Sequence, residues 1–468
     1  MDLMEGKIVK SICLDCIEED FLSKEIALNG KLLKCSYCKI RKKTYTLDMI
    51  KDRVHEVIQL YYEQTSNEPN EYESRMQWDS DSKYEWERDG AEIVEVIEEL
   101  LGVEEKISKD ILKSLQEEHV NYSDEVEGPY DDSTMYKEKK RTGEEFNLKW
   151  QIFEENLKLK SRYFGHQVFL DELFSGLHKF VTTDSKPVIT IIGPKMKPAP
   201  IFRARVAKNY RDLTEILKFP EKELGPPPSS TIKGGRMNAP GIAVFYGAFS
   251  QECAISEVRP HKGAKVIVGK FEAIKNLRLL DIPSLRSIEL NGSLFDPEHR
   301  ISLEVSNFLS ELSHRISRLV TPEEENWDYL ATQIIADYLA WNKDLSIQGL
   351  IYESAYHSGG SNVVIFNSFA TIDLSEAVDP KRVDVWMPYN PEDDEDSINI
   401  SIEYQETEVH KDNFNFNDAD SEFRNGLKKS GSYLSLDKND IQVVEVEKIK
   451  IEQKSISVQT YRQKKSAF

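Results

Sequence analysis

The stretch GGRMNAPGIAVFYGAFSQECAISEVRP (residues 234–260) combines turn residues, an apolar segment and charged side chains within 27 residues. Its glycines and proline predict tight turns that let the backbone approach a ligand. The apolar run up to Phe245 and Tyr246 predicts a strand, and a carboxylate, Glu257, follows beside Arg259. Since the guanidinium of an arginine such as Arg236 suits phosphate, we expect this stretch to form the floor of a functional site.

The composition indicates a folded protein of several domains. The chain has 468 residues, of which 39% are hydrophobic and 10% aromatic, which predicts two to four domains. The formal net charge of -21 disfavours general binding to nucleic acid or to anionic membranes, because both polyanions would be repelled. The sequence contains no apolar run of about 18 residues, the length that would predict a membrane span. The first residues also lack the apolar core of a signal peptide. We therefore expect a cytoplasmic protein.

Four of the five cysteines form two CxxC pairs, Cys13 with Cys16 and Cys35 with Cys38. Two such pairs let four thiolates converge on one tetrahedral ion, which predicts a structural Zn²⁺ site in a zinc-ribbon-like module over residues 1–46. Two disulfides or four free thiols are the alternative, which a cytoplasmic location disfavours.

Residues 47–182 are expected to form a helical domain. Apolar periodicity predicts helices over residues 48–64 and 93–101, and a third over 107–119 with Ser108 as its N-cap. Residues 121–143 are polar and charged, which predicts a linker. One or two further amphipathic helices are expected between residue 144 and residue 180.

Strand-like runs begin after residue 187 and predict an α+β domain over residues 187–380. Two amphipathic helices interrupt the strands, and the second places Leu330, Ile334, Tyr338 and Trp341 on one face. Residues 381–468 are expected to form a separate, β-rich extension with a hairpin over residues 441–461. Strands are expected over residues 188–193, 266–271, 277–282, 349–354 and 362–367, and a further strand is expected close before Arg203 and Arg205.

Five residues carry a resemblance to a known family. Arg203 in IFRAR, Arg236 in GGRMNAPG, Tyr246 in VFYGA, Glu257 in ISEVR and Ser354 in IYESA resemble the motifs of the RES domain. The resemblance covers about residues 198–370. It implies an α+β fold similar to ADP-ribosyltransferase toxins, with a split β core that binds NAD and flanking helices. The family's best-known members are NAD⁺-degrading toxins of toxin–antitoxin pairs.

The chemistry of these residue types agrees with that resemblance. Cleavage of the nicotinamide–ribose bond builds oxocarbenium charge, which a carboxylate such as Glu257 would stabilise. Guanidinium groups such as those of Arg203 and Arg236 suit a diphosphate. We further expect Tyr246 to stack on the nicotinamide or ribose, Ser354 to bind the nicotinamide amide or an incoming phosphate, and Gln333 to give polar support.

Each assignment has a competing structural interpretation. Arg205 lies on the same strand face as Arg203 and could be confused with it, because residues two apart in a strand share a face. Tyr246 lies in an apolar run and would serve equally well as a core residue. Cys253 lies among small residues of an expected helix, which favours packing.

The N-terminal region is similar to the helical domains found ahead of RES or HEPN modules. HEPN ribonucleases use an arginine and a histidine a few residues apart, and the nearest pair here, Arg162 and His166, is one residue too close. We therefore assign no ribonuclease activity.

The leading hypothesis is an NAD⁺-degrading enzyme, phosphorolytic with phosphate as co-substrate or hydrolytic, that acts as a bacterial toxin or phage-defence effector. An antitoxin or regulatory protein is an expected partner, and a homo-oligomer is compatible with the sequence. The alternatives are an ADP-ribosyltransferase that modifies a macromolecule, and a non-catalytic, zinc-containing binding protein.

Overall fold

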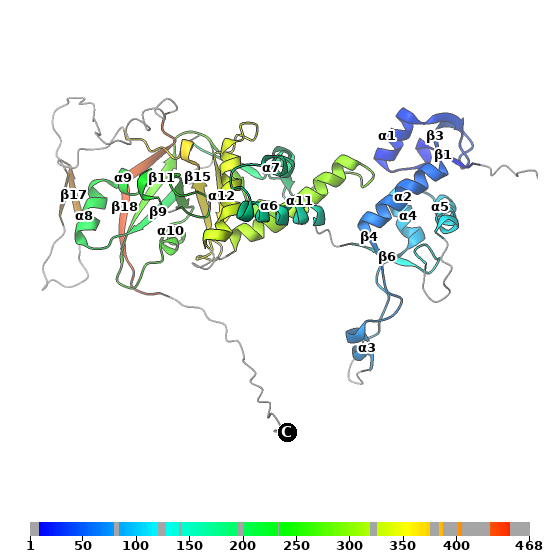
Figure 1. Ribbon diagram of the computed structural model, residues 1–468, viewed down its shortest axis with the longest axis horizontal. Coiled ribbons are helices and arrows are strands. Elements are labelled where there is room, and N and C mark those ends of the chain that lie inside the picture. Colours follow the sequence, from blue (N-terminus) through cyan, green and yellow to red (C-terminus); the bar gives the residue numbers. More distant parts are fainter. Residues whose placement is uncertain are drawn as a thin grey trace, which may run out of the picture. The chain divides into compact units, whose positions relative to one another are not determined.

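The computed structural model describes most of the chain, in two compact units (Figure 1). The first unit comprises Met1–Gln151 with Ile288–Glu311, and the second comprises Ile152–Ser287 with Leu312–Phe468. The described residues are 9–78, 84–119, 128–139, 143–194, 196, 200–232, 234–318, 325–374, 383–386, 400–404 and 431–449.

The first unit combines helices with two three-stranded sheets, ordered β1-β3-β2 and β4-β6-β5. Helices α6 (Glu144–Leu159) and α11 (Pro297–Ser317) each begin in this unit and end in the second. The remaining elements are β1 (Ser11–Cys13), η1 (Leu14–Cys16), α1 (Asp20–Asn29), β2 (Lys31–Lys34), β3 (Arg41–Thr46), α2 (Leu47–Tyr61), β4 (Tyr62–Gln64), α3 (Glu71–Trp78), β5 (Ala91–Glu92), α4 (Ile93–Leu101), α5 (Glu105–Glu118), β6 (Met135–Glu138) and β13 (Ile288–Glu289).

The core of the first unit forms where α2, α4 and α5 bury their apolar stripes together, as Ile50, Ile97 and Ile111 illustrate. The helices predicted over residues 48–64 and 93–101 are confirmed as α2 and α4. Helix α4 ends at Gly102, whose φ of 58° is a left-handed conformation that glycine adopts easily.

Two expectations for this region were wrong. Helix α5 begins at Glu105, so Ser108 is a buried interior residue and not the N-cap. Its hydroxyl has two acceptors within reach of its one proton, Glu98 Oε1 of α4 at 2.8 Å and the Glu105 carbonyl of its own helix at 2.9 Å. Ser108 therefore does not cap the helix. The linker predicted over residues 121–143 contains strand β6, whose sequence MYKE is too short for a clear period.

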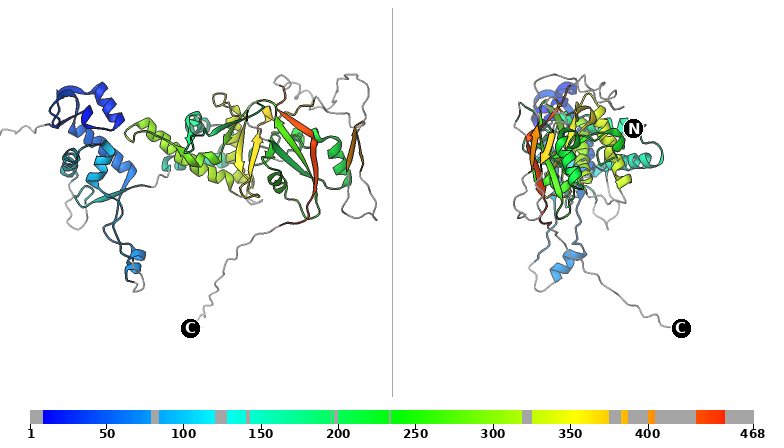
Figure 2. Two further views of the ribbon diagram at one scale, coloured as in Figure 1. Left: turned by 180° about the vertical axis from the view of Figure 1, so that it is seen from behind. Right: turned by 90° about the vertical axis from the view of Figure 1, so that its left-hand side faces the viewer.

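The second unit is built on an eight-stranded sheet, which the view from behind shows with its covering helices (Figure 2). Its elements are α7 (Gln167–Phe174), η2 (Leu177–Lys179), β7 (Val181–Thr182), β8 (Ile189–Ile192), β9 (Ile201–Val206), α8 (Tyr210–Lys218), α9 (Pro220–Glu223), η3 (Ser229–Thr231), β10 (Phe245–Ala248), α10 (Gln251–Glu257), β11 (Lys265–Ala273), β12 (Leu277–Asp281), η4 (Pro283–Ser287), α12 (Glu325–Trp341), β14 (Gly349–Glu353), β15 (Ser361–Ile365), η5 (Asn367–Phe369), β16 (Val383–Trp386), β17 (Ser401–Tyr404) and β18 (Leu434–Glu445).

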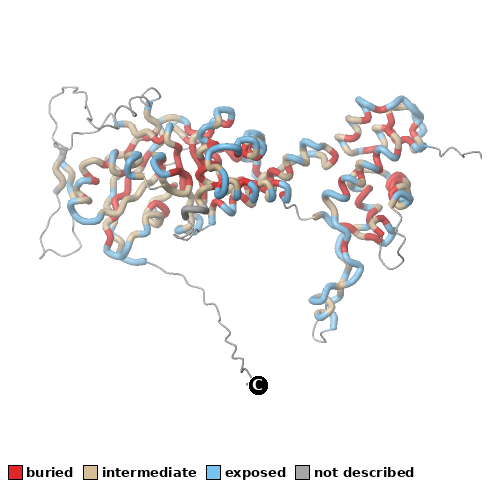
Figure 3. The backbone as a smooth tube through the Cα atoms, in the orientation of Figure 1, coloured by how far each residue is buried: buried red, intermediate tan, exposed pale blue. Residues whose placement is uncertain are grey.

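The strand order is β18-β11-β9-β10-β15-β14-β12-β8, and β12 pairs with β14 in parallel while the other described pairs are antiparallel. This order places β10 between β9 and β15, with Ala248 opposite both Phe202 and Asn362. Strands β11, β12, β14 and β15 are largely buried, whereas β9 and β18 are mostly half-buried (Figure 3). The mixed α+β architecture expected from the sequence is confirmed.

Predictions for the rest of this unit had mixed outcomes. Ile334 and Tyr338 of α12 are buried as expected, but Trp341 is 66% exposed because it lies at the end of the helix. The alternating run at residues 400–404 forms β17, which pairs with β16. Strand β18 pairs with β11, and residues 450–461 of the hairpin expected over residues 441–461 lie outside the described residues. Among the described helices, none is both long and apolar enough to cross a membrane.

Substitution of Leu279 tests the importance of the sheet core. Leu279 in β12 is fully buried, and we expect Leu279→Ala to lower the free energy of unfolding by about 2–5 kcal/mol, because it deletes packed methyl groups and leaves a cavity. Urea denaturation of the full chain measures this. Ile191→Ala in the neighbouring strand β8, where the side chain is 36% exposed, is the matched control and should have less than half the effect. Equal losses would contradict this account of the core.

Candidate functional site

A cavity of about 320 Å³ lies in the second unit. Strands β9, β10, β14 and β15 and helices α10 and α12 all contribute to it. Of the predicted site residues, Arg203, Arg236, Tyr246 and Glu257 line the cavity. Ser354 bonds to Glu257, whereas Gln333 bonds to Gly235, the neighbour of Arg236 in the chain. The lining residues are Phe202, Arg203, Ala204, Arg236, Tyr246, Gly247, Ala248, Ala254, Glu257, Val258, Arg259, Tyr329, Tyr352, Glu353, Ala355, Tyr356 and Asn362.

Glu257 is the last residue of α10, a helix whose N-cap is Ser250. Its Oε1 accepts two hydrogen bonds, from Ser354 Oγ at 2.6 Å and from Asn362 Nδ2 at 2.7 Å. Among the described residues, no hydrogen bond reaches its second oxygen, Oε2. The carboxylate is therefore fixed through one oxygen, and the other remains available to a ligand.

Asn362 is a site residue to which the sequence analysis gave no role. It begins the apolar strand β15 and is only 2% exposed. Because the Glu257 carboxylate can only accept, the Asn362 NH₂ group must face it, and the amide Oδ1 then faces the Cys253 thiol at 3.3 Å. The available signal was a polar residue within a buried apolar run, which requires a hydrogen-bonding partner.

Cys253 therefore does more than fill space. It is fully buried, and burial raises the pKa of its thiol, which keeps the S–H proton available for donation to Asn362 Oδ1. The thiol thus fixes the amide orientation that Glu257 requires.

Ser354 follows β14 and connects the acid to a loop. Its hydroxyl donates to Glu257 and accepts from the backbone N–H groups of Tyr356 at 3.2 Å and His357 at 3.0 Å. Its single proton is committed to the carboxylate, so Ser354 anchors the loop of residues 355–360 beside Glu257.

Arg203 and Arg205 leave the same strand but differ in their partners. Arg205 pairs with Glu223 and, at 3.6 Å, with Asp212. The Arg203 guanidinium lies 5.0 Å from the centre of the Phe245 ring, and its buried Nη1 has no hydrogen-bond partner among the described residues. Burial, with a smaller contribution from Arg205, lowers the pKa of Arg203 to about 10. Arg203 therefore has donor capacity and charge that no described side chain satisfies.

Arg236 bonds to the backbone at the C-terminal end of α11. Its guanidinium donates to the carbonyl of Ile316 and, at 2.9 Å, to that of Arg318. Helix α12 secures the same loop, since Thr332 Oγ1 donates to the Arg236 carbonyl at 2.6 Å. Arg236 thus lines the cavity while two of its donor nitrogens are already bonded.

Gln333 bonds to the loop that contains Gly235 and Arg236. Its Nε2 donates to the Gly235 carbonyl at 2.7 Å, and its Oε1 accepts from Arg162. His166, the partner considered for Arg162, instead bonds through Nε2 to the Ser161 carbonyl at 2.7 Å. Arg162 and Gln333 therefore hold the loop and do not reach the cavity.

Tyr246 joins β10 to the turn that precedes it. Its hydroxyl accepts from Met237 N at 3.0 Å and donates to Asn238 Oδ1 at 2.8 Å, while its ring lines the cavity. Burial raises the pKa of Tyr246, which keeps the phenol neutral and able to donate. The two interpretations of Tyr246, core residue and site residue, both describe part of what it does.

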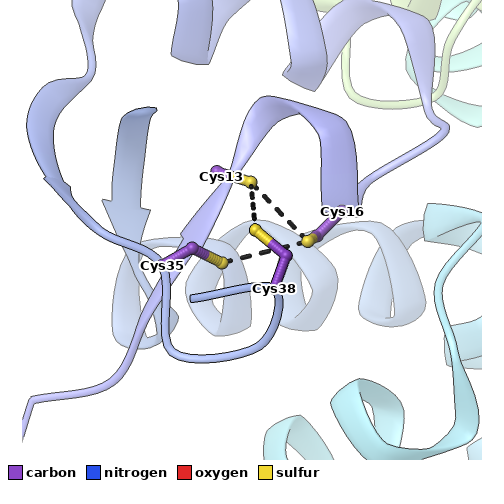
Figure 4. Close-up of side chains that lie close together, drawn as sticks. All are labelled: Cys13, Cys16, Cys35 and Cys38. Atoms are coloured by element: carbon purple, nitrogen blue, oxygen red, sulfur yellow. Dashed lines mark hydrogen bonds between the residues drawn. The ribbon is translucent and has the colours of Figure 1, made fainter. Parts of the chain in front are cut away.

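The four cysteines of the first unit form a separate candidate site for a metal (Figure 4). Cys13 and Cys16 lie at the ends of β1 and η1, and Cys35 and Cys38 lie in the turn between β2 and β3. The sulfur of Cys13 is 3.6 Å from those of Cys16 and Cys38, too far for a disulfide. Four sulfurs placed tetrahedrally around Zn²⁺ at about 2.3 Å would be about 3.8 Å apart. The cluster therefore fits zinc.

Comparison with family models matches two parts of the chain. Residues 205–386 match the RES domain, and residues 29–169 match HEPN/RES N-terminal domain 1. Arg203 lies just before the first of these segments. No curated protein and no solved structure matches the chain.

Removal of one cysteine tests the metal site. We expect the purified chain to contain about one zinc ion, and Cys35→Ser to contain almost none, because the shell loses one of its four thiolates. Elemental analysis by mass spectrometry measures both. Cys253→Ser, which alters a cysteine of the second unit, should keep its zinc; equal zinc in the two variants would contradict the assignment.

Substitution of Asn362 tests how Glu257 is held. Asn362→Ala removes one of the two donors to the Glu257 carboxylate, and we expect it to lower the free energy of unfolding by about 1.5–3 kcal/mol, because a hydrogen bond to a charged group is lost. Urea denaturation of the full chain measures this. Cys253→Ser retains a donor to the amide and should lose less stability. An unchanged free energy of unfolding in Asn362→Ala would contradict the role of Asn362 in holding the acid.

Proposed function

We propose that this chain, which belongs to the RES-domain family, degrades NAD⁺ by cleaving the nicotinamide–ribose bond through phosphorolysis or hydrolysis. RES and HEPN/RES families are associated with NAD-related toxin or defence modules. The observation that carries the proposal is the cavity itself, which is lined both by Glu257, with its free carboxylate oxygen, and by Arg203, with its unpartnered Nη1. A ligand with a positive charge at one end and phosphate at the other fits that pair.

Glu257 would act on the electrostatics of bond cleavage. Nicotinamide leaves NAD⁺ as a neutral molecule that takes the electron pair of the C1′–N1 bond, so its departure needs little acid catalysis. The positive charge that develops on the ribose is stabilised by the carboxylate. An oxygen of phosphate or water then bonds to C1′, and in hydrolysis the water's proton passes to solvent.

The other residues would orient the substrate. Arg203 contacts the diphosphate, and the Tyr246 ring packs on the nicotinamide or the ribose. Arg236 would also contact phosphate. It would do so only through the part of its guanidinium that is not bonded to the two carbonyls. Ser354, like Gln333, serves through its neighbours, since its proton is held by Glu257. The proposal includes a core similar to ADP-ribosyltransferases.

The first unit would regulate this activity. Its zinc-ribbon-like module, with structural Zn²⁺, precedes the helices. The enzyme would serve as a toxin or defence effector, and an antitoxin or another regulatory partner would control it. Transfer of ADP-ribose to a macromolecule is the competing outcome, which the experiment below separates.

Product analysis tests the proposed reaction. The full chain is incubated with NAD⁺, with and without phosphate, and the products are resolved by mass spectrometry. ADP-ribose-1″-phosphate would indicate phosphorolysis, free ADP-ribose hydrolysis, and a mass increase on protein transfer; intact NAD⁺ would contradict the proposal. We expect Glu257→Gln to lower the rate at least about 100-fold, because it removes the stabilising charge. Glu252→Gln, an exposed glutamate of the same helix, is the control and should match the unsubstituted chain.

A further inference from the structure

Arg259 holds a backbone conformation that is unfavourable for its residue type. It follows α10 by two residues, and its φ is 46°, in the left-handed region. Glycine is the usual residue where a helix ends in this way, because a side chain there is strained by about 1 kcal/mol or more. A charged residue at this position suggests that its side chain has a function that offsets the strain.

Arg259 lines the cavity but has no acidic partner among the described residues. Its guanidinium lies 4.5 Å from the centre of the Tyr356 ring, and both residues line the cavity. Among the described residues no carboxylate forms an ion pair with it, and the residue is exposed. Stacking on an aromatic ring uses the guanidinium face and leaves its N–H edge free for bidentate contact with an oxyanion.

Arg259 is also joined to the candidate acid. The Tyr356 N–H bonds to Ser354 Oγ, which in turn donates to Glu257. The stacked pair is therefore placed by the same hydrogen bonds that fix the carboxylate. Any ligand group bound at Arg259 would lie at a defined position relative to Glu257.

The three arginines of the cavity differ in what they can still bind. Arg236 already donates to two backbone carbonyls. Arg203 has a buried nitrogen with no partner among the described residues, and Arg259 has its outer edge free. The acid nearest in sequence to the loop, Glu353, pairs with Arg286 at 2.8 Å and does not neutralise them.

We propose that Arg259, stacked on Tyr356, forms with Arg203 a clamp for the diphosphate of the ligand. The inference rests on the proposed function and assigns the second phosphate contact to Arg259 in place of Arg236. It predicts that the site recognises diphosphate esters, whose two negative charges match two guanidinium groups. A nucleoside that lacks phosphate would not contact Arg259.

Replacement by glycine separates binding from folding. We expect Arg259→Gly to bind ADP-ribose about 10- to 100-fold more weakly, because a charge-assisted bidentate contact is lost. The same variant should melt at a higher temperature, because glycine relieves the strained φ. Affinities are measured by calorimetry on the full chain with ADP-ribose, ADP and nicotinamide riboside, and stability by calorimetric melting.

Controls distinguish the clamp from general damage. Arg211→Ala removes an exposed arginine of α8 that does not line the cavity and should bind ADP-ribose normally. Nicotinamide riboside should bind Arg259→Gly within about twofold of the unsubstituted chain. Unchanged ADP-ribose affinity in Arg259→Gly, equal losses for both ligands, or no binding of any diphosphate ester would overturn the clamp. Binding of ADP-ribose and ADP needs no turnover. If the protein binds them through Arg259 but does not degrade NAD⁺, the proposed reaction is refuted and the clamp is not.

Discussion

The candidate site depends on the two hydrogen bonds that Glu257 Oε1 accepts from Ser354 and Asn362. These bonds join the end of α10 to the end of β14 and to the start of β15, two strands that follow α10 by about a hundred residues in the chain. The two donors fix one carboxylate oxygen and leave the other free. The register that places Tyr352 opposite Asn362 aligns the ends of the two strands at this carboxylate.

The sequence predicted the elements of the second unit better than the contacts between them. Apolar runs identified most strands and both long helices, because their burial imposes a clear period. In the first unit, the short strand β6 was missed and the start of α5 was misplaced, because four residues carry no periodicity and Ser108 bonds inside its helix. The exposed Trp341 shows that a helical face need not stay buried to its last turn.

The sequence predicted which residue types form the site but not which partners each of them bonds to. The arginines look alike in sequence, yet Arg205 forms ion pairs, Arg236 bonds to carbonyls and Arg203 keeps an unpartnered nitrogen. Only the fold determines these partners, since Ile316 and Glu223 come from distant segments. Asn362 went unassigned and Cys253 was assigned to packing alone for the same reason, because their roles arise from a contact between α10 and β15.

The distribution of charge in the cavity indicates the kind of ligand that would complete it. Arg203 and Arg259 lack acidic partners among the described residues, while Glu257 is held by neutral donors only. Burial lowers the pKa of Arg203, so an anion bound beside it would stabilise its charged form. A diphosphate would supply that anion, and a cationic ring near Glu257 would supply the opposite charge. On our proposal, a dinucleotide with a cationic base would match the carboxylate at one end and the two guanidinium groups at the other.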